Sequence, residues 1–249
     1  MELKNLDEGP SGGELFAEFP AASGAVIIGG AGGIGGALVE AIRRMDKFAS
    51  PVALGRRSSP PLDLLDERTV AAAADHVRTS GLQVRLVIVA SGFLHGEGFM
   101  PEKSRDQIDP VHMAHAFALN AIGPALIAKH FLPLLPRKGK SVFAVLSARV
   151  GSIGDNRMGG WYSYRASKAA LNQIIRTSAV ELAHRRSQTI CVALHPGTVD
   201  TGLSAPFSKT GLDVRPPATA ASEILAVIDG LEPADSGGFF DPKGKRVPW

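Results

Sequence analysis

Short hydrophobic runs alternate along the chain with longer segments in which hydrophobic residues recur every three or four positions. The runs, each the length of a strand buried on both faces, cover residues 25–28, 51–54, 85–90, 141–146 and 189–194. The periodic segments, each the length of an amphipathic helix, cover residues 34–45, 67–79, 110–135, 164–184 and 220–231. Asp109 and Pro110 suit the N-cap and first position of the third helix. This alternation predicts a Rossmann-type α/β fold: a doubly wound parallel sheet of about seven strands with helices on both faces.

Residues 1–23 differ from the rest of the chain. They include the run Gly9-Pro10-Ser11-Gly12-Gly13 and five acidic side chains, and they contain no continuous apolar segment. This composition predicts a loose N-terminal extension and is unlike a secretory signal peptide. No linker interrupts residues 24–249, which we expect to form a single domain.

Composition excludes several other classes of protein. Hydrophobic residues make up 45% and charged residues 20% of the 249, so the chain is neither disordered nor fibrous. No window of about 18 consecutive apolar residues occurs, so we expect no membrane-spanning helix, and the net charge of +3 is too small to indicate nucleic-acid binding. The single cysteine, Cys191, permits no intrachain disulfide, which favours a cytoplasmic protein. His112 and His115 lack a third ligand at a characteristic spacing, so we expect no metal site.

A glycine-rich turn follows the first predicted strand. Gly29, Gly33 and Gly35 form G-x-x-x-G-x-G where the first predicted helix begins, with Ile34 between the last two glycines. A dinucleotide pyrophosphate requires close approach of the backbone and the N–H groups of a helix N-terminus, so residues without Cβ must line such a turn. The pattern therefore predicts a dinucleotide-binding domain, and the alternative is a flexible turn without a ligand.

The end of the second predicted strand indicates which dinucleotide is bound. NAD-binding proteins usually place a carboxylate about 20 residues beyond the last glycine, where this chain has Gly55. Arg56 and Arg57 follow it, and guanidinium groups bind a phosphate through charge-assisted bonds. We therefore expect NADP(H) to be preferred over NAD(H), the alternative being solvated loop arginines without a ligand. Asp63 and Leu64, after a short third strand, are candidates to hold the adenine amine and ring.

Tyr164 and Lys168 are four residues apart on the fourth predicted helix, so their side chains lie on one face. A cation beside a phenol favours the phenolate. The spacing therefore predicts that Lys168 lowers the pKa of Tyr164 towards neutrality, which would make Tyr164 a general acid or base. The alternative is a pair of solvated side chains on an exposed helix face.

In combination, the turn and the Tyr–Lys pair resemble the short-chain dehydrogenase/reductase family, whose signature joins an N-terminal G-x-x-x-G-x-G to a later Y-x-x-x-K. Asn120 begins an N-x-x-G that is similar to a motif of that family's long helix. The resemblance implies that Tyr164 transfers the proton, that Lys168 binds the nicotinamide ribose and that Asn120 completes a proton relay through water. A P-G-x-x-x-T segment is also similar to the family's contact with the nicotinamide carboxamide, which implies cofactor contacts for Pro196, Gly197, Val199 and Thr201.

Within the family, the chain most resembles the subgroup of the C-factor protein and sniffer-type NADPH-dependent carbonyl reductases. The segments that carry this narrower resemblance are Gly92-Phe93-Leu94-His95, Gly151-Ser152-Ile153-Gly154-Asp155-Asn156 and Trp161-Tyr162-Ser163-Tyr164. Family resemblance also implies a homodimer or homotetramer, with the helices that begin at Pro110 and near Tyr164 as the interface.

Two segments depart from the family pattern. The family's catalytic serine is the first residue of S-x-x-G, and this chain has Ala148 there, preceded by Ser147. Neighbouring residues of a strand face opposite sides, so Ser147 replaces the missing hydroxyl only if the strand has already ended. Ser152 is a second candidate, and for both serines a hydroxyl bonded to local backbone is an equally open interpretation. Val89-Ala90-Ser91-Gly92 stands where the family has N-N-A-G, and Gly92 still permits a close approach to the cofactor.

The sequence therefore predicts an NADP(H)-dependent oxidoreductase that transfers hydride between nicotinamide and a small-molecule carbonyl or secondary alcohol. The alternative is an NADP(H)-binding sensor with little or no turnover, because Ala148 replaces the usual serine. We expect residues 203–217 to cover the substrate pocket. The catalytic candidates are Tyr164, Lys168, Asn120 and Ser147, and the candidate pocket residues are Phe93, Leu94, Met158, Trp161 and Phe207.

Overall fold

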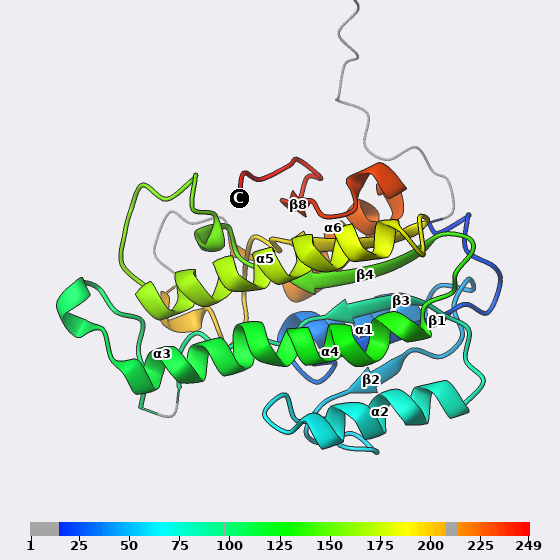
Figure 1. Ribbon diagram of the computed structural model, residues 1–249, viewed down its shortest axis with the longest axis horizontal. Coiled ribbons are helices and arrows are strands. Elements are labelled where there is room, and N and C mark those ends of the chain that lie inside the picture. The colour runs from blue at the N-terminus through cyan, green and yellow to red at the C-terminus, as the bar shows by residue number, and fades with distance from the viewer. Residues whose placement is uncertain (1–14, 97, 208–213) are drawn as a thin grey trace, which may run out of the picture.

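The computed structural model describes residues 15–96, 98–207 and 214–249 of the chain. Within these residues, six parallel strands form the central sheet, in the order β2-β1-β3-β4-β5-β8 (Figure 1). These strands are β1 (Gly24–Ile28), β2 (Val52–Leu54), β3 (Val84–Val89), β4 (Ser141–Leu146), β5 (Thr189–Leu194) and β8 (Phe239–Phe240). A second small sheet pairs β6 (Thr198–Val199) with β7 (Val214–Arg215). The predicted doubly wound α/β fold is confirmed.

Helices cover both faces of the sheet, with α2, α4 and α5 in front of it and α1 and α6 behind it in Figure 1. The side chains of β1 alternate accordingly: Val26 and Ile28 pack towards the first group, and Ala25 and Ile27 towards the second. The α-helices are α1 (Gly33–Arg43), α2 (Glu67–Thr79), α3 (Pro110–Phe117), α4 (Gly123–Phe131), α5 (Tyr162–Ala183) and α6 (Pro217–Gly230). Short 3-10 turns are η1 (Arg105–Gln107), η3 (Leu132–Leu134), η4 (Arg149–Gly151), η5 (Ala205–Phe207) and η6 (Pro233–Asp235).

The short strand expected before Asp63 does not form. Pro60 and Pro61 have no backbone N–H to donate to a neighbouring strand. The next N–H, that of Leu62, donates instead to the carbonyl of Gly55 at 2.9 Å, which folds this segment back onto the end of β2. The central sheet consequently has six strands in the described residues, where about seven were expected.

The helix predicted over residues 110–135 is divided into α3, a π-helical turn over Ala118–Ile122 (η2) and α4. Its start is as predicted, since the Asp109 side chain accepts from the N–H of His112 at 2.8 Å. Pro124 cannot donate to the carbonyl of Asn120, and the Gly123 N–H reaches back five residues to Ala118, so the helix widens at this point. Asn120 therefore lies at the centre of a helical irregularity, where functional residues are often found.

By length and composition, Pro110–Leu134 would be able to cross a membrane, although polar residues interrupt its apolar sequence. In its most apolar window, 44% is buried within the protein. Ile127, Ala128 and Phe131 pack into the hydrophobic core on this face of the sheet. The core helix of a globular domain can have the same length and apolar composition, because it too needs an apolar side to pack.

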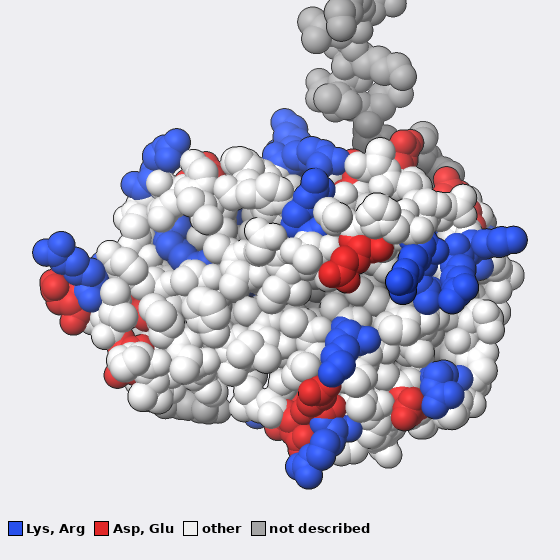
Figure 2. Space-filling view, viewed as in Figure 1, with Lys and Arg blue, Asp and Glu red and all other residues white. Residues whose placement is uncertain are grey.

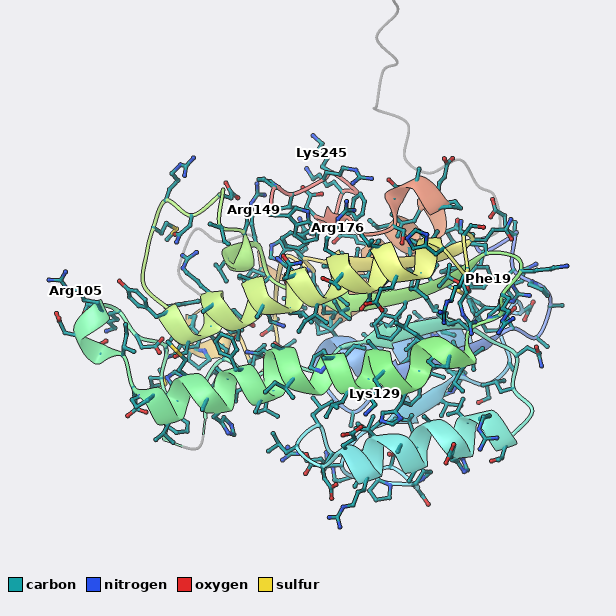
Figure 3. All side chains as sticks on the ribbon, in the orientation of Figure 1. Phe19, Arg105, Lys129, Arg149, Arg176 and Lys245 are labelled. Carbon is teal, nitrogen blue, oxygen red and sulfur yellow. The ribbon has the colours of Figure 1, made fainter. Side chains whose placement is uncertain are left out.

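Part of the expected N-terminal extension packs against the domain; residues 1–14 of it lie outside the described residues. The rings of Phe16 and Phe48 have centroids 5.0 Å apart, and Phe19 completes the cluster. The Phe16 N–H donates to the side chain of Asp229 at 2.7 Å. Figure 3 shows Phe19 at the opposite end of the molecule from Arg105, which precedes α3.

Candidate functional site

The carboxyl ends of the parallel strands meet at one edge of the sheet. The arrowheads in Figure 1 point towards this edge, where the segments after β1, β3, β4 and β5 gather. The strand order reverses between β1 and β3, because β2 lies beyond β1 and β4 lies beyond β3. Ligands of doubly wound sheets bind at such a switch point. Most of the residues predicted from the sequence lie in these segments.

The glycine-rich turn is sterically restricted to glycine. A Cβ on Gly35 would lie 2.1 Å from the carbonyl oxygen of Gly29, and a Cβ on Gly33 would lie 2.6 Å from the methyl group of Thr201. Gly29 itself has φ +84°, in the left-handed region. The turn is closed against β2 by the Gly29 N–H, which donates to Leu54 at 2.8 Å. The backbone can thus approach a ligand closely here.

Helix α1 begins at this turn. Its N-cap, Gly32, makes no side-chain cap hydrogen bond, and no acidic residue occupies the first turn, which includes Ile34. The first N–H groups of a helix attract anions, so this end suits a phosphate group. A cradle of tightly packed glycines and an uncapped helix N-terminus together fit the pyrophosphate of a dinucleotide.

Arg56 and Arg57 lie in the turn that follows β2, next to the glycine-rich turn. Both side chains are exposed, and neither forms an ion pair with another described residue. The turn is closed by Ser58, whose N–H and hydroxyl both donate to the Gly55 carbonyl. Two exposed guanidinium groups thus follow the strand that borders the glycine-rich turn, and their contact with a phosphate stays a prediction.

Asp63 and Leu64 already have local partners. The Asp63 carboxylate accepts from the Leu65 N–H at 3.0 Å, and the Asp63 N–H donates to Thr69 at 2.8 Å. Leu64 lies against Gly123 at the start of α4, where an added Cβ would come within 2.7 Å of it. Contact of these two residues with an adenine stays a prediction.

The Tyr–Lys pair lies in a buried site at the start of α5. Tyr164 is 9% and Lys168 3% exposed. The Lys168 ammonium is 5.8 Å from the centre of the Tyr164 ring and donates to the carbonyl of Leu146, at the end of β4, at 2.9 Å. The solvated-surface alternative for this pair is therefore wrong.

Asn120 connects three elements at this site. Its side-chain amide exchanges two hydrogen bonds with the backbone of Phe93, accepting at 2.7 Å and donating at 2.8 Å. It also donates to the hydroxyl of Ser167 at 3.0 Å, and that hydroxyl donates to the Tyr164 carbonyl at 2.9 Å. Asn120 thereby joins the segment after β3 to the first turns of α5.

Gly92 lies between the two polar side chains. A Cβ there would be 3.6 Å from the Lys168 nitrogen and 3.7 Å from the Asn120 oxygen. The structure thus brings together Tyr164, Lys168, Asn120 and Gly92, which come from three distant parts of the sequence.

Burial sets the protonation state of the Tyr–Lys pair. It raises the pKa of the Tyr164 phenol above its usual value and lowers the pKa of the Lys168 ammonium to about 8. The expectation that Lys168 lowers the pKa of Tyr164 is therefore wrong for this structure, because desolvation of the phenolate is the dominant effect on Tyr164. At neutral pH Tyr164 is a phenol, which is the form that donates a proton.

The two candidate serines have other partners. The Ser147 hydroxyl donates to the Asn172 side chain at 2.6 Å, and the Ser152 hydroxyl donates to the Pro248 carbonyl at 2.5 Å. Ala148 keeps an extended backbone, with φ −145° and ψ 143°, so the strand direction persists past Ser147. Since β4 itself ends at Leu146, this backbone does not decide whether Ser147 could replace the missing hydroxyl, and its catalytic role stays a prediction.

The segment after β5 returns to the glycine-rich turn. Thr201 lies against Gly33, and Val199 is buried in β6. Pro196 and Gly197 form the turn between β5 and β6, and Gly197 has φ +80°. This segment thus closes the cradle opposite β2.

Aromatic side chains stand beside Tyr164. The Trp161 ring centre is 6.1 Å from that of Tyr164 and 5.2 Å from that of Phe207, which lies 5.4 Å from His95. Phe93 is buried with its backbone held by Asn120, whereas Met158 is 91% exposed. Residues 208–213 of the expected cover lie outside the described residues.

Three polar residues of this site were not found from the sequence: Glu102, Ser167 and Asn172. Ser167 and Asn172 recur at helical spacing with Tyr164 and Lys168, which was a usable signal. Glu102 lies in a loop and gave no periodic signal. It faces His112, with 3.4 Å between Oε1 and Nδ1. Among the described residues, no three potential ligands lie together as a metal site would require.

Comparison with known proteins places this geometry in a family. A family model described as "Enoyl-(Acyl carrier protein) reductase" matches residues 34–220. The chain is 39% identical over 142 residues to the C-signal protein of Myxococcus xanthus, covering 57% of this chain and 81% of that protein. It is 30% identical over 201 residues to the 1-hydroxy-2-glutathionyl-2-methyl-3-butene dehydrogenase of Rhodococcus sp. (strain AD45), covering 81% of this chain and 84% of that protein.

Solved structures share the fold. The carbonyl reductase Sniffer of D. melanogaster superposes with a TM-score of 0.78 at 22% identity, covering 92% of this chain and all of that one. The NADPH-bound carbonyl reductase from chicken fatty liver superposes with a TM-score of 0.79 at 24% identity, covering 96% of this chain and all of that one. The family match, the glycine-rich turn and the buried Tyr–Lys pair agree with one another. The chain therefore belongs to the short-chain dehydrogenases/reductases and is an NAD(P)-dependent oxidoreductase of that family.

Proposed function

We propose that residues 24–249 form one dinucleotide-binding and catalytic domain that reduces carbonyl compounds with NADPH, with Tyr164 as the proton donor. The observation that carries the proposal is the convergence of Tyr164, Lys168 and Asn120 beside Gly92, at the same sheet edge as the glycine-rich turn. The solved neighbours include carbonyl reductases, one of them described as NADPH-bound, which supports this choice of reaction.

The cofactor would lie along the carboxyl edge of the sheet. The turn from Gly29 to Gly35 and the N-terminus of α1 would hold its pyrophosphate, and Arg56 and Arg57 would hold a 2′-phosphate. Its other end would reach Gly92, Lys168 and the segment from Pro196 to Thr201. When bound, the nicotinamide supplies a hydride.

The chain's own residues would manage the proton. The Tyr164 phenol would give its proton to the carbonyl oxygen as the carbonyl carbon is reduced, so the alcohol would leave neutral. A proton would then return to Tyr164 through water near Asn120, and Lys168 would bind the nicotinamide ribose. Because burial raises the pKa of Tyr164, the phenol is the resting form, and carbonyl reduction requires a phenol as the proton donor.

Ala148 leaves the carbonyl oxygen without the hydroxyl donor that the family's serine supplies. Such a donor lowers a barrier by ~3 kcal/mol. Tyr164 is then the main donor to the developing oxyanion, so we expect turnover that is slow but measurable.

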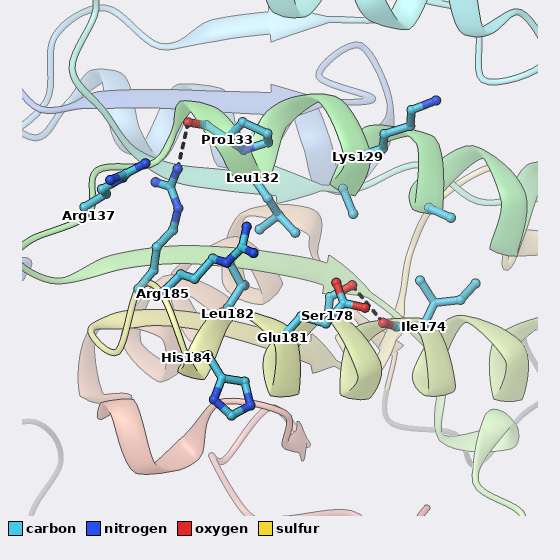
Figure 4. A pocket seen from close by; sticks show the side chains of 13 residues that line it. Lys129, Leu132, Pro133, Arg137, Ile174, Ser178, Glu181, Leu182, His184 and Arg185 are labelled. Carbon is cyan, nitrogen blue, oxygen red and sulfur yellow. Dashed lines mark hydrogen bonds between the residues drawn. The ribbon is translucent and has the colours of Figure 1, made fainter.

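We also propose a homo-oligomer built on the face of α3, α4 and α5. Figure 2 shows few charges on the left half of this face, whereas Lys129, Glu181 and Arg185 line the groove between α4 and α5. Val111, Ile122 and Val180 are between 50% and 65% exposed on these elements. Between α4 and α5 runs a groove of about 1280 Å³, with Leu132 and Ile174 among its lining residues (Figure 4). Ile122→Arg should reduce the mass measured by light scattering to that of one chain, and an unchanged mass would contradict this interface.

The setting we propose is cytoplasmic. The lone Cys191 is fully buried in β5, where burial raises its thiol pKa to about 12 and keeps the thiol unreactive.

The first test is titration with NADPH and NADH, followed by cofactor oxidation with a panel of aldehydes, ketones and quinones. Tyr164→Phe should bind NADPH as tightly as the parent protein and lose turnover by roughly 100-fold or more. Tight binding of NADPH without turnover on any panel member would favour the sensor. Failure to bind either nucleotide would contradict both functions.

A further inference from the structure

A buried carboxylate lies beside the helix that carries Tyr164. The Glu102 side chain is 1% exposed, and that of His112, its neighbour at 3.4 Å, is 5% exposed. A carboxylate withdrawn from water this far destabilises the fold unless it is paired and hydrogen-bonded. Its partners therefore indicate what it does.

Glu102 caps α5 from a distant part of the chain. Its carboxylate oxygens accept from the N–H of Ser163 at 3.2 and 3.3 Å and also accept from the Ser163 hydroxyl. Helix α5 begins at Tyr162, and its N-cap, Trp161, provides no side-chain cap. A negative charge at a helix N-terminus is favourable, and here it comes from a residue 61 positions earlier.

The same residue holds a strained turn. Trp161 has φ 53° and ψ 43°, a left-handed conformation that bulky residues rarely adopt. Such strain persists only where surrounding contacts enforce it, and it is frequent at functional sites. The Trp161 N–H donates to the Glu102 backbone carbonyl at 2.5 Å, while the Glu102 carboxylate accepts from the N–H of Ser163. Glu102 therefore fixes the chain on both sides of Tyr162.

His112 fixes Glu102 from the opposite side. Its ring stacks on Phe99, with centroids 4.9 Å apart and planes 6° from parallel. Its backbone N–H is bound by the Asp109 cap of α3. The carboxylate is thus held between the first turns of α3 and α5.

We propose that Glu102 is a positioning residue: it holds the left-handed turn at Trp161, and so sets both the Trp161 ring and the Tyr164 phenol, whose ring centres lie 6.1 Å apart. The kinetic part of this inference rests on the proposed function. The structural part, the placement of Trp161, does not depend on turnover.

The test uses the full chain with Trp249→Phe, so that Trp161 is the sole tryptophan. In this background Glu102→Gln retains the side-chain shape and removes the charge. We expect acrylamide to quench Trp161 fluorescence more strongly, and kcat to fall by roughly 10- to 100-fold as the phenol is displaced. The dissociation constant of NADPH should stay within about twofold, since the pyrophosphate cradle is built from other elements.

Glu67→Gln is the matched control. It removes a carboxylate that pairs with Lys129 at 2.6 Å and His130 at 3.0 Å, away from Tyr164. Neither quenching nor kcat should change in it. If Glu102→Gln fails to fold, Ser163→Ala removes one donor to the carboxylate and should shift both readouts in the same direction by a smaller amount.

Unchanged quenching in the folded Glu102→Gln protein would overturn the proposal, whatever happens to kcat. Stronger quenching in a protein whose parent shows no turnover on any carbonyl would uphold the placement of Trp161 and refute the proposed reductase. Stronger quenching with unchanged kcat in an active enzyme would overturn the part that concerns Tyr164.

Discussion

The two ends of the candidate site are built in different ways. At the proposed pyrophosphate end, the backbone forms the site: a side chain at Gly33 or Gly35 would collide with Thr201 or Gly29, and α1 begins there. At the proposed proton-transfer end, side chains from distant segments form the site, and Asn120 and Lys168 are each held by backbone carbonyls. The first end depends on local sterics and the second on long-range hydrogen bonds, so each should fail in its own way.

The largest effect should follow from a single methyl group in the turn. Gly35→Ala places a Cβ 2.1 Å from the Gly29 oxygen, so the turn must move away from its ligand. Strain of ~3 kcal/mol would weaken NADPH binding by at least about 100-fold, measured by fluorescence titration. Gly36→Ala is the control, because its Cβ would meet Gly30 at an ordinary 3.6 Å. Equal affinity in the two variants would mean that the turn does not hold the nucleotide.

Loss of the two arginines should weaken the binding of NADPH without weakening that of NADH. When both Arg56 and Arg57 are replaced by alanine, a 2′-phosphate loses its charge-assisted bonds. The affinity for NADPH should then fall by about 10- to 100-fold, while the affinity for NADH stays constant. The ratio of the two dissociation constants measures this. Arg78→Ala, which removes an exposed arginine paired with Asp75 on α2, should leave the ratio unchanged. A parallel loss for both nucleotides would contradict a 2′-phosphate role.

The activity that depends on Tyr164 and Lys168 should change with pH, whereas the glycine turn contains no titratable side chain. Burial lowers the pKa of Lys168 to about 8, so its ammonium is present below that pH and lost above it. If the charge is needed beside Tyr164, kcat/KM for NADPH at saturating carbonyl should fall by up to roughly tenfold per pH unit above pH 8. Tyr164 adds no descending limb there, because burial raises its pKa.

Lys168→Arg provides the check on that profile. The guanidinium remains charged across this range, so the descending limb should disappear even if the rate is lower overall. A profile of the parent protein that stays flat to pH 9.5 would remove the Lys168 charge from the mechanism.

The same contrast explains what could be predicted from the sequence. The glycine turn, the arginines and the helix over Glu67–Thr79 depend on neighbouring residues, and their patterns located them. Pro60 and Pro61 argue locally against the short strand expected before Asp63. Patterns could not show that the chain there folds back onto the end of β2. Nor could they show that Glu102 caps a helix 61 residues away, or that burial outweighs a nearby cation at Tyr164. These depend on contacts that exist only in the folded chain.

The smallest effect is expected at Ser147, although it was a catalytic candidate. Its hydroxyl donates to Asn172 at 2.6 Å. Ser147→Ala should therefore change kcat by less than about threefold, whereas loss of an oxyanion donor costs about 100-fold or more. Asn172 loses its buried donor, so the free energy of unfolding should fall by ~1 kcal/mol in denaturant titrations. A large loss of kcat at unchanged stability would return Ser147 to the reaction and show that its bond to Asn172 breaks when substrate binds.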